Sequence, residues 1–265
     1  MEPEGDVLEK LIDHDARYFT MVASLEKTPC AWFLYGPELP EYGDANRALR
    51  LRDDGRGPEA VSREVIAYFR SRGLPAVADV DAVAEAQGIG SALRRMGIVP
   101  VLGDTLWMRY PLPEPPNVNA PGARVDVVPN ETGAGEARVW IETTLSDVEG
   151  TESAALWRAV AEREARYLAC RLYLGLLSGQ PAGTCDLFAA EGWGRVESVA
   201  TRPEFRRRGV ASAVVARAVA DSLQMGNTVT YLLTEPGGAG EQVYRRLGFV
   251  PWGLNILRRH RTAQS

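Results

Sequence analysis

The chain has 265 residues, of which 45% are hydrophobic and 25% charged, and its formal net charge is −5. This length suits two domains of ordinary size, each with enough apolar residues to bury a core. The acidic balance argues against nucleic acid as a partner, and no apolar run reaches the ~18–20 residues of a membrane helix. The start of the chain lacks the basic and apolar segments of a secretory signal, so we expect a cytoplasmic protein.

The three cysteines and two histidines do not form a pattern that is typical of a metal site. Cys30, Cys170 and Cys185 are widely separated, and neither His14 nor His260 lies at a metal-ligand spacing from other ligands. We therefore expect reduced thiols, no bound metal and no histidine-based catalysis.

A proline-rich segment, residues 111–122, divides the predicted elements into two series. It has five prolines in twelve residues, which excludes a helix or an inner strand, and we interpret it as a linker. The expected domains are therefore residues 1–110 and 123–265. Upstream, hydrophobic periodicity predicts strands at 31–35, 46–51 and 75–80, helices at 58–72 and 82–96, and two further strands ending at Arg109.

Downstream, the pattern predicts a comparable series. We expect strands at 124–128, 196–200 and 228–233, helices at 152–167, 209–224 and 239–247, a strand pair joined near 178–181, and a terminal pair of strands. Leu93-Arg-Arg-Met-Gly-Ile-Val-Pro100 aligns with Tyr244-Arg-Arg-Leu-Gly-Phe-Val-Pro251 at an offset of 151 residues (244 − 93). The match comes at the end of the same order of elements, which favours a duplication over coincidence.

The segment before the predicted helix at 209–224 has the composition of an anion-binding turn. Arg206, Arg207 and Arg208 oppose the positive end of the helix dipole, so a negative group is needed to offset them. Gly209 permits a close approach of the backbone, and the free N–H groups of the first helical turn are donors that suit a pyrophosphate. The alternative is a solvated basic loop that Glu204 partly neutralises.

Two motifs in this half resemble those of the GNAT acetyltransferases. Arg206, Gly209 and Ala211 match the family's Q/R-x-x-G-x-G/A signature, and Tyr244, Gly248 and Phe249 match its later Y-x-x-x-G-F. The two motifs begin 38 residues apart (244 − 206), and the resemblance covers most of residues 124–260.

The resemblance implies a fold and a cofactor. It implies mixed α/β domains, each with a mostly antiparallel twisted sheet, helices on both faces and a V-shaped splay between two parallel strands. It further implies that acetyl-CoA is the acyl donor, with its pantetheine in the V and the main chain of Val199 beside the thioester. The residues implied to bind it are Val199, Ala200, Thr201, Arg206, Arg207, Arg208, Gly209, Val210, Ala211 and Ser212.

Two residues are candidates for proton transfer. Tyr244 lies where the resemblance places the tyrosine that protonates the departing CoA thiolate, and the alternative is a core tyrosine. Glu197 lies two residues before Val199, so alternation puts both on one face of a strand, where related enzymes use a carboxylate to take the amine proton. The alternative for Glu197 is a surface ion pair with Arg195.

The first half lacks the features of the anion-binding turn. At the equivalent position it has Asp53 and Asp54, which repel anions, and Pro58, which removes an N–H group. We therefore expect a degenerate copy that binds no CoA. Residues 1–122 have 13 Lys and Arg against 19 Asp and Glu (−6), and residues 123–265 have 17 against 16 (+1).

The sequence thus predicts an N-acetyltransferase that transfers acetyl directly from acetyl-CoA to a primary amine of a small molecule, either a metabolite or an antibiotic. Two alternatives stay open at this point: acetylation of a protein amino group, and a protein that senses acyl-CoA without turnover. The sequence does not reveal the acceptor, the acyl-chain preference or the oligomeric state.

Overall fold

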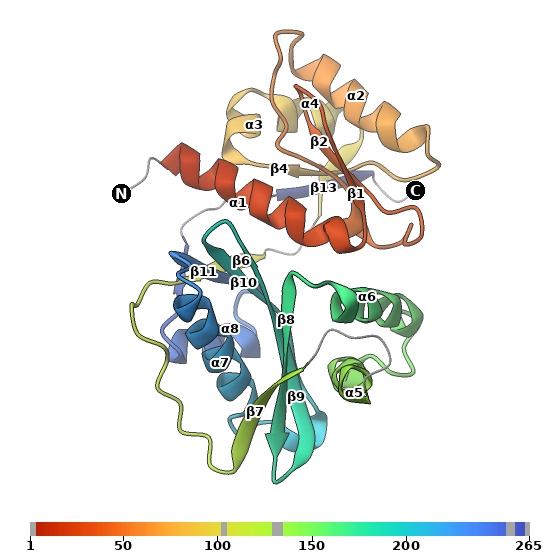
Figure 1. Ribbon diagram of the computed structural model, residues 1–265. Coiled ribbons are helices and arrows are strands. Elements are labelled where there is room, and N and C mark those ends of the chain that lie inside the picture. Colours follow the sequence, from red (N-terminus) through yellow and green to blue (C-terminus); the bar gives the residue numbers. More distant parts are fainter. Residues whose placement is uncertain (1–3, 102–104, 129–134, 253–257, 263–265) are drawn as a thin grey trace. The chain divides into compact units, whose positions relative to one another are not determined.

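The computed structural model describes residues 4–101, 105–128, 135–252 and 258–262 (Figure 1). The chain divides into two compact units, one of residues 1–103 with 254–265 and the other of residues 104–253. Each unit has one sheet in which antiparallel neighbours predominate and one pair of strands is parallel. The expected mixed α/β fold with two sheets is therefore confirmed.

The first unit has a six-stranded sheet in the order β1-β2-β3-β4-β13-β5. Its elements are α1 (Glu4–Tyr18), β1 (Ser24–Lys27), β2 (Trp32–Tyr35), β3 (Asn46–Leu49), α2 (Pro58–Arg70), β4 (Val77–Val80), α3 (Ala82–Ala86), α4 (Ile89–Arg95), β5 (Ile98–Pro100) and β13 (Arg258–Thr262). Apolar side chains of α2, α3 and α4 form its main core with inward-facing residues of β2, β3 and β4, including Phe33, Val65 and Phe69.

The second unit has a seven-stranded sheet in the order β12-β6-β11-β10-β9-β8-β7. Its elements are β6 (Leu106–Tyr110), β7 (Ala123–Val128), α5 (Gly135–Thr144), α6 (Ala154–Arg166), β8 (Cys170–Leu177), β9 (Gln180–Ala190), β10 (Trp193–Thr201), α7 (Val210–Gln224), β11 (Val229–Thr234), α8 (Ala239–Arg246) and β12 (Val250–Pro251). α7 and α8 pack on one face of this sheet, and α5 and α6 pack on the other (Figure 1). Two separate cores result, because alternate residues of each inner strand face opposite helices.

Three elements were not expected from the sequence, and one expected helix is divided. α1, β1 and α5 were missed, although α1 places Leu8, Leu11 and Ile12 at helical spacing and buries all three. The helix expected at 82–96 is two helices, α3 and α4, because Gly88 adopts a left-handed φ of 78° between them. None of the helices in the described ranges is long and apolar enough to cross a membrane.

Each sheet contains one strand from the other half of the sequence. β6 precedes the proline-rich segment, yet it pairs antiparallel with β11 and β12 of the second unit. β13 follows the second unit, yet it pairs antiparallel with β4 and β5 of the first. The terminal strands expected as a pair, β12 and β13, therefore lie in different sheets.

The exchange explains why the compact units differ from the expected domains. The domains were expected to be residues 1–110 and 123–265, but residues 104–122 lie with the second unit and residues 254–265 with the first. The proline-rich segment was a reasonable boundary, since it contains no helix or strand among its residues. Nothing in the local sequence indicates that β6 pairs with the second sheet and β13 with the first, because strand pairing is set by distant residues.

The two sheets repeat one strand order, which supports the duplication. In each sheet, a parallel pair (β3 with β4, β10 with β11) is followed by the exchanged strand (β13 or β6) and then by a short edge strand (β5 or β12). α4 and β5 of the first unit correspond to α8 and β12 of the second, as the offset of 151 residues predicts. The exchanged strands, β6 and β13, occupy equivalent places.

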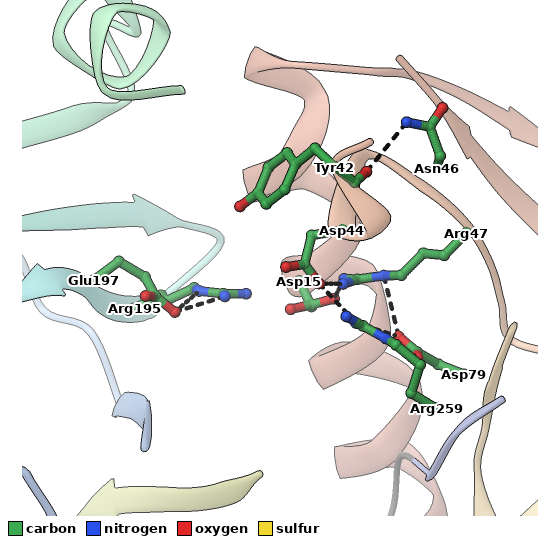
Figure 2. Close-up of polar contacts among 9 residues, drawn as sticks. All are labelled: Asp15, Tyr42, Asp44, Asn46, Arg47, Asp79, Arg195, Glu197 and Arg259. Carbon is green, nitrogen blue, oxygen red and sulfur yellow. Dashed lines mark hydrogen bonds and ion pairs between the residues drawn. The ribbon is translucent and has the colours of Figure 1, made fainter. Parts of the chain in front are cut away.

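Partly buried ion pairs attach β13 to the first unit (Figure 2). Arg47 on β3 has 3% of its side chain exposed and forms ion pairs with Asp15, Asp44 and Asp79. Arg259 on β13 reaches Asp79 at 3.0 Å and Asp44 at 2.7 Å. Two arginines and three aspartates thus join α1, β3, β4 and β13.

The strand exchange predicts which fragments of the chain fold. A fragment of residues 104–253 retains all seven strands of its sheet and should be monomeric, with cooperative thermal unfolding. A fragment of residues 123–265 lacks β6, so β12 loses its only partner and the edge of β11 is exposed. We expect this second fragment to aggregate in size-exclusion chromatography. Equal solubility and equal cooperativity of the two fragments would contradict the exchange.

Candidate active site

The turn between β10 and α7 presents backbone N–H groups without acceptors in the helix. Arg207 (φ 59°) and Gly209 (φ 83°) are both left-handed, and α7 starts after Gly209 with no side-chain cap. The N–H of Ala213 donates to the carbonyl of Gly209 at 2.9 Å. The N–H groups of Val210 to Ser212 therefore point beyond the start of the helix, where they and the helix dipole suit a phosphate.

Two of the arginines in this turn have contacts with neighbouring residues. The guanidinium of Arg206 forms an ion pair with Asp147, and its Nε donates to the carbonyl of Thr201 at 3.3 Å. The guanidinium of Arg208 lies 5.8 Å from the ring centroid of Phe205. Because the side chain of Arg206 is about half exposed (51%), it can exchange Asp147 for another anion at little cost.

Two glycines let α7 pack closely on the sheet. Gly175 on β8 and Gly183 on β9 are directly paired. A Cβ atom at Gly175 would lie 2.8 Å from Cγ1 of Val214, and one at Gly183 would lie 2.7 Å from Cγ1 of Val210. Neither position has room for a side chain, so these glycines fix the height of the helix start above the sheet.

Gly209 has a structural role that the sequence did not indicate. It was expected to let the backbone approach a ligand closely. Its φ of 83° favours glycine irrespective of any ligand, and a Cβ atom there would lie 3.0 Å from Cβ of Ala120. The proline-rich segment that contains Ala120 therefore packs directly against the turn.

The two parallel strands separate several residues before the turn. β10 and β11 pair from Trp193 with Val229 to Val196 with Leu232, and their pairing stops there. β10 continues along β9, but the register shifts between Glu197 and Ala200. This irregularity is a β-bulge at Ser198, whose φ is 52°. The main chain of Val199 to Thr201 is consequently not paired with β11.

The bulge changes which face of β10 its residues occupy. Alternation predicted that Glu197 and Val199 share a face. Val199 instead packs against the cluster that contains Val196, the immediate neighbour of Glu197. The prediction of a shared face is wrong, because the extra residue of the bulge shifts the alternation by one position.

Glu197 is held by an arginine on its own strand (Figure 2). Nε and Nη2 of Arg195 donate to Oε1 of Glu197 at 2.9 and 2.6 Å. The Arg195 side chain is 4% exposed and that of Glu197 25%. The ion pair expected as the structural alternative is therefore present, and it fixes the orientation of a carboxylate that is still accessible.

Tyr244 on α8 is buried in the same apolar cluster as Val199. Burial raises the pKa of its hydroxyl well above the usual value of 10.0, and the charges of Glu197 and Cys185 act in the same direction. The phenol therefore keeps its proton at neutral pH, as a proton donor must. Tyr244 and Val199 thus share one apolar cluster, whereas Glu197 is linked to Tyr244 only by the electrostatic effect of its charge.

Sequence reasoning missed a buried carboxyl group beside Glu197. Asp186 on β9 is the register partner of Glu197 and is fully buried, and neither of its oxygens has a hydrogen-bond partner of normal geometry within the described ranges. Burial raises its pKa well above the usual value, with contributions from Glu164 and Glu197, while Arg195 and the backbone of Glu197 oppose the shift. An aspartate between Cys185 and Leu187 in an inner strand was the signal that could have revealed it.

The raised pKa of Asp186 gives a pH-dependent prediction. A carboxyl whose pKa is higher in the folded state contributes most to stability below its unfolded pKa, ~3.9, and this contribution is lost as pH rises through the folded pKa. Asp186→Asn cannot ionise. Its Tm by scanning calorimetry should therefore exceed that of the wild type at pH 8, and the difference should shrink towards pH 4. A difference that is constant with pH would show that Asp186 titrates normally.

Comparisons with known proteins agree with this geometry. Residues 137–249 match the model of the acetyltransferase (GNAT) family. No curated protein matches the chain by sequence.

Solved structures show similarity over most of the chain. A GCN5-related N-acetyltransferase from Kribbella flavida is 17% identical, with a TM-score of 0.71 over 98% of this chain and 96% of that one. One from Sphaerobacter thermophilus is 18% identical, with a TM-score of 0.56 over 81% and 70%. A tandem GNAT protein from the clavulanic acid biosynthesis pathway is 14% identical, with a TM-score of 0.57 over 83% and 76%. At these identities the likeness shows a shared fold.

Proposed function

We propose that the chain is an acetyl-CoA-dependent N-acetyltransferase whose acceptor is a primary amine of a small molecule, and the match of residues 137–249 to the GNAT acetyltransferase family supports this. The observation that carries the proposal is the uncapped start of α7, placed at the end of a strand that separates from its parallel neighbour. This arrangement offers N–H donors for a pyrophosphate beside an unpaired main chain for the pantetheine.

The residues present fit acetyl-CoA. Arg206 to Ser212 would hold the pyrophosphate, and the main chain of Val199 to Thr201 would hold the pantetheine and the thioester. When bound, acetyl-CoA supplies an activated acetyl group to an attacking amine. The ion pair of Arg206 with Asp147 supports this assignment, because an anionic group already lies at the guanidinium.

Glu197 and Tyr244 have the properties that proton transfer needs. Glu197 would accept a proton from the amine, with its carboxylate oriented by Arg195. Tyr244 would donate its proton to the thiolate that leaves, since its hydroxyl is protonated at neutral pH.

The first unit differs from the second in its turn and at the positions of both candidate groups, which supports our proposal that it binds no CoA. Oδ1 of Asp53 accepts hydrogen bonds from the N–H groups of Gly55 at 3.0 Å and Gly57 at 2.8 Å. A carboxylate of the chain thus accepts hydrogen bonds from N–H groups of this turn. Pro58 has no N–H group, so it removes one further donor at the start of α2. Subtracting 151 places Leu93 at the position of Tyr244.

Asn46 replaces the candidate base in the first unit. It lies at the position of Glu197 (197 − 151), and its amide nitrogen donates to the carbonyls of Leu39 and Tyr42 at 2.7 and 3.1 Å. Its Oδ1 accepts from the N–H of Gly36 at 3.0 Å. This side chain holds a loop in place and has no capacity to take a proton from an amine.

Calorimetric titration with acetyl-CoA tests the donor site. We expect one site per chain. Arg206→Ala should weaken binding by ~10-fold, because it removes a charged hydrogen-bond donor from the turn. The matched control is Arg56→Ala, which removes an exposed arginine from the equivalent turn of the first unit and should leave the Kd unchanged. Two sites would contradict a silent first unit, and no binding would overturn the transferase proposal.

Variants of the two candidate groups test turnover. Tyr244→Phe and Glu197→Gln should each lower kcat by ~10²-fold while leaving the Kd of acetyl-CoA unchanged, because general acids and bases act on the reaction step. The measurement is release of free CoA with a panel of primary amines and, separately, of lysine-containing peptides. Turnover with peptides alone would assign a protein acceptor. Binding without turnover in the wild type would favour a sensor.

A further inference from the structure

The bulge in β10 is held by side chains from β9 and from the helices that cover one face of the sheet. A residue in a strand with a φ of 52° is strained unless it is glycine, and here the residue is Ser198. The ladder between β9 and β10 is interrupted at the same point. Polar groups near the bulge therefore need partners from elsewhere.

α5 supplies two of these partners. Nε1 of Trp140 donates to the carbonyl of Cys185, which lies in the interrupted part of the ladder, at 3.2 Å. The hydroxyl of Thr144 donates to Oγ1 of Thr184 at 3.0 Å, and the hydroxyl of Thr184 donates to the carbonyl of Ser198 at 3.2 Å. Thr184 is fully buried, so solvent does not compete for these bonds.

α6 supplies the remaining partner. The hydroxyl of Ser198 donates to Oε2 of Glu164 at 2.9 Å, and Glu164 is buried, with 5% exposure. The bulge is thereby fixed at both its side chain and its carbonyl oxygen, by groups 14 and 34 residues away in the sequence.

We propose that Glu164 and Thr184 are positioning residues for acetyl transfer, because they hold the bulge at Ser198 and so set the direction of the main chain of Val199. This inference rests on the proposed function, in which that main chain lies beside the thioester. The two residues act through β10 and need no contact with either substrate. Loss of the hydrogen bond from Ser198 leaves the left-handed conformation without its support, and the strand can relax towards regular pairing with β9.

The effect on rate follows from the position of the bulge. A displacement of about 1 Å at a reacting group can lower a rate by ~10²-fold, even when the mutation lies outside the site. The pyrophosphate turn begins beyond Thr201 and is anchored separately by the glycine contacts of α7. Loosening the bulge should therefore lower kcat and leave the affinity for acetyl-CoA nearly unchanged.

The test compares substitutions that keep or remove the acceptor for Ser198. Glu164→Gln retains an oxygen that can accept the bond, and Glu164→Leu does not. Ser198→Ala removes the donor while leaving Glu164 in place, so it can replace Glu164→Leu in the test if that variant does not fold. The control is Glu162→Leu on the same helix, two residues away, where the side chain faces another direction.

We expect Glu164→Leu and Ser198→Ala to lower kcat by ~10–100-fold with the Kd of acetyl-CoA within about threefold, and Glu164→Gln and Glu162→Leu to match the wild type. Hydrogen exchange of peptides that cover residues 193–201 should be faster in the first two variants alone. If Glu164→Gln is as slow as Glu164→Leu, the charge and not the hydrogen bond matters, and the inference is overturned. Unchanged kcat and exchange in Glu164→Leu also overturn it.

The outcomes separate this inference from the proposed function. If the wild type releases no CoA with any amine, the proposed function fails, and the role of Glu164 and Thr184 in acetyl transfer fails with it. If the wild type is active and the variants at positions 164 and 198 are equally active, the inference alone fails.

Discussion

One strand carries the constraint on which the candidate site depends. β10 stays paired with β9 along most of its length, but it must leave β11 after Val196. A regular strand cannot do both, and the left-handed residue at Ser198 supplies the change of direction. The main chain of Val199 to Thr201 takes its direction from that residue, whereas the turn after Thr201 is anchored separately by the glycine contacts of α7.

Equivalent strands in the two units show how one fold can keep or lose a site. In the first unit, β3 and β4 pair at Ala48 with Ala78, so these parallel strands also have little contact. Arg47, which is buried among three carboxylates, stabilises that region, and Asp53 engages N–H groups of its turn. The first unit thus has its own charged groups at positions that correspond to those where we propose that the second binds acetyl-CoA.

The sequence predicted the elements better than their pairing. The arginine-rich turn, the start of α7 and the repeat of α4 with α8 follow from local spacing, and the structure has them where expected. The bulge was not predictable, because serine has no preference for a left-handed φ and the support from Glu164 comes from a distant helix. Asp186 was missed for a similar reason: its unusual state depends on burial by residues that lie far away in the sequence.

The exchange of β6 and β13 has a consequence for the order in which the protein is made. Arg259 is separated by 180 residues from Asp79, and the strand that carries it is synthesised after the whole second unit. During synthesis on the ribosome, β13, which lies between β4 and β5, is not yet available to the first sheet. The second sheet, in contrast, already has β6 when its other strands emerge. The unit with the catalytic candidates can thus fold first, and the first unit is completed last.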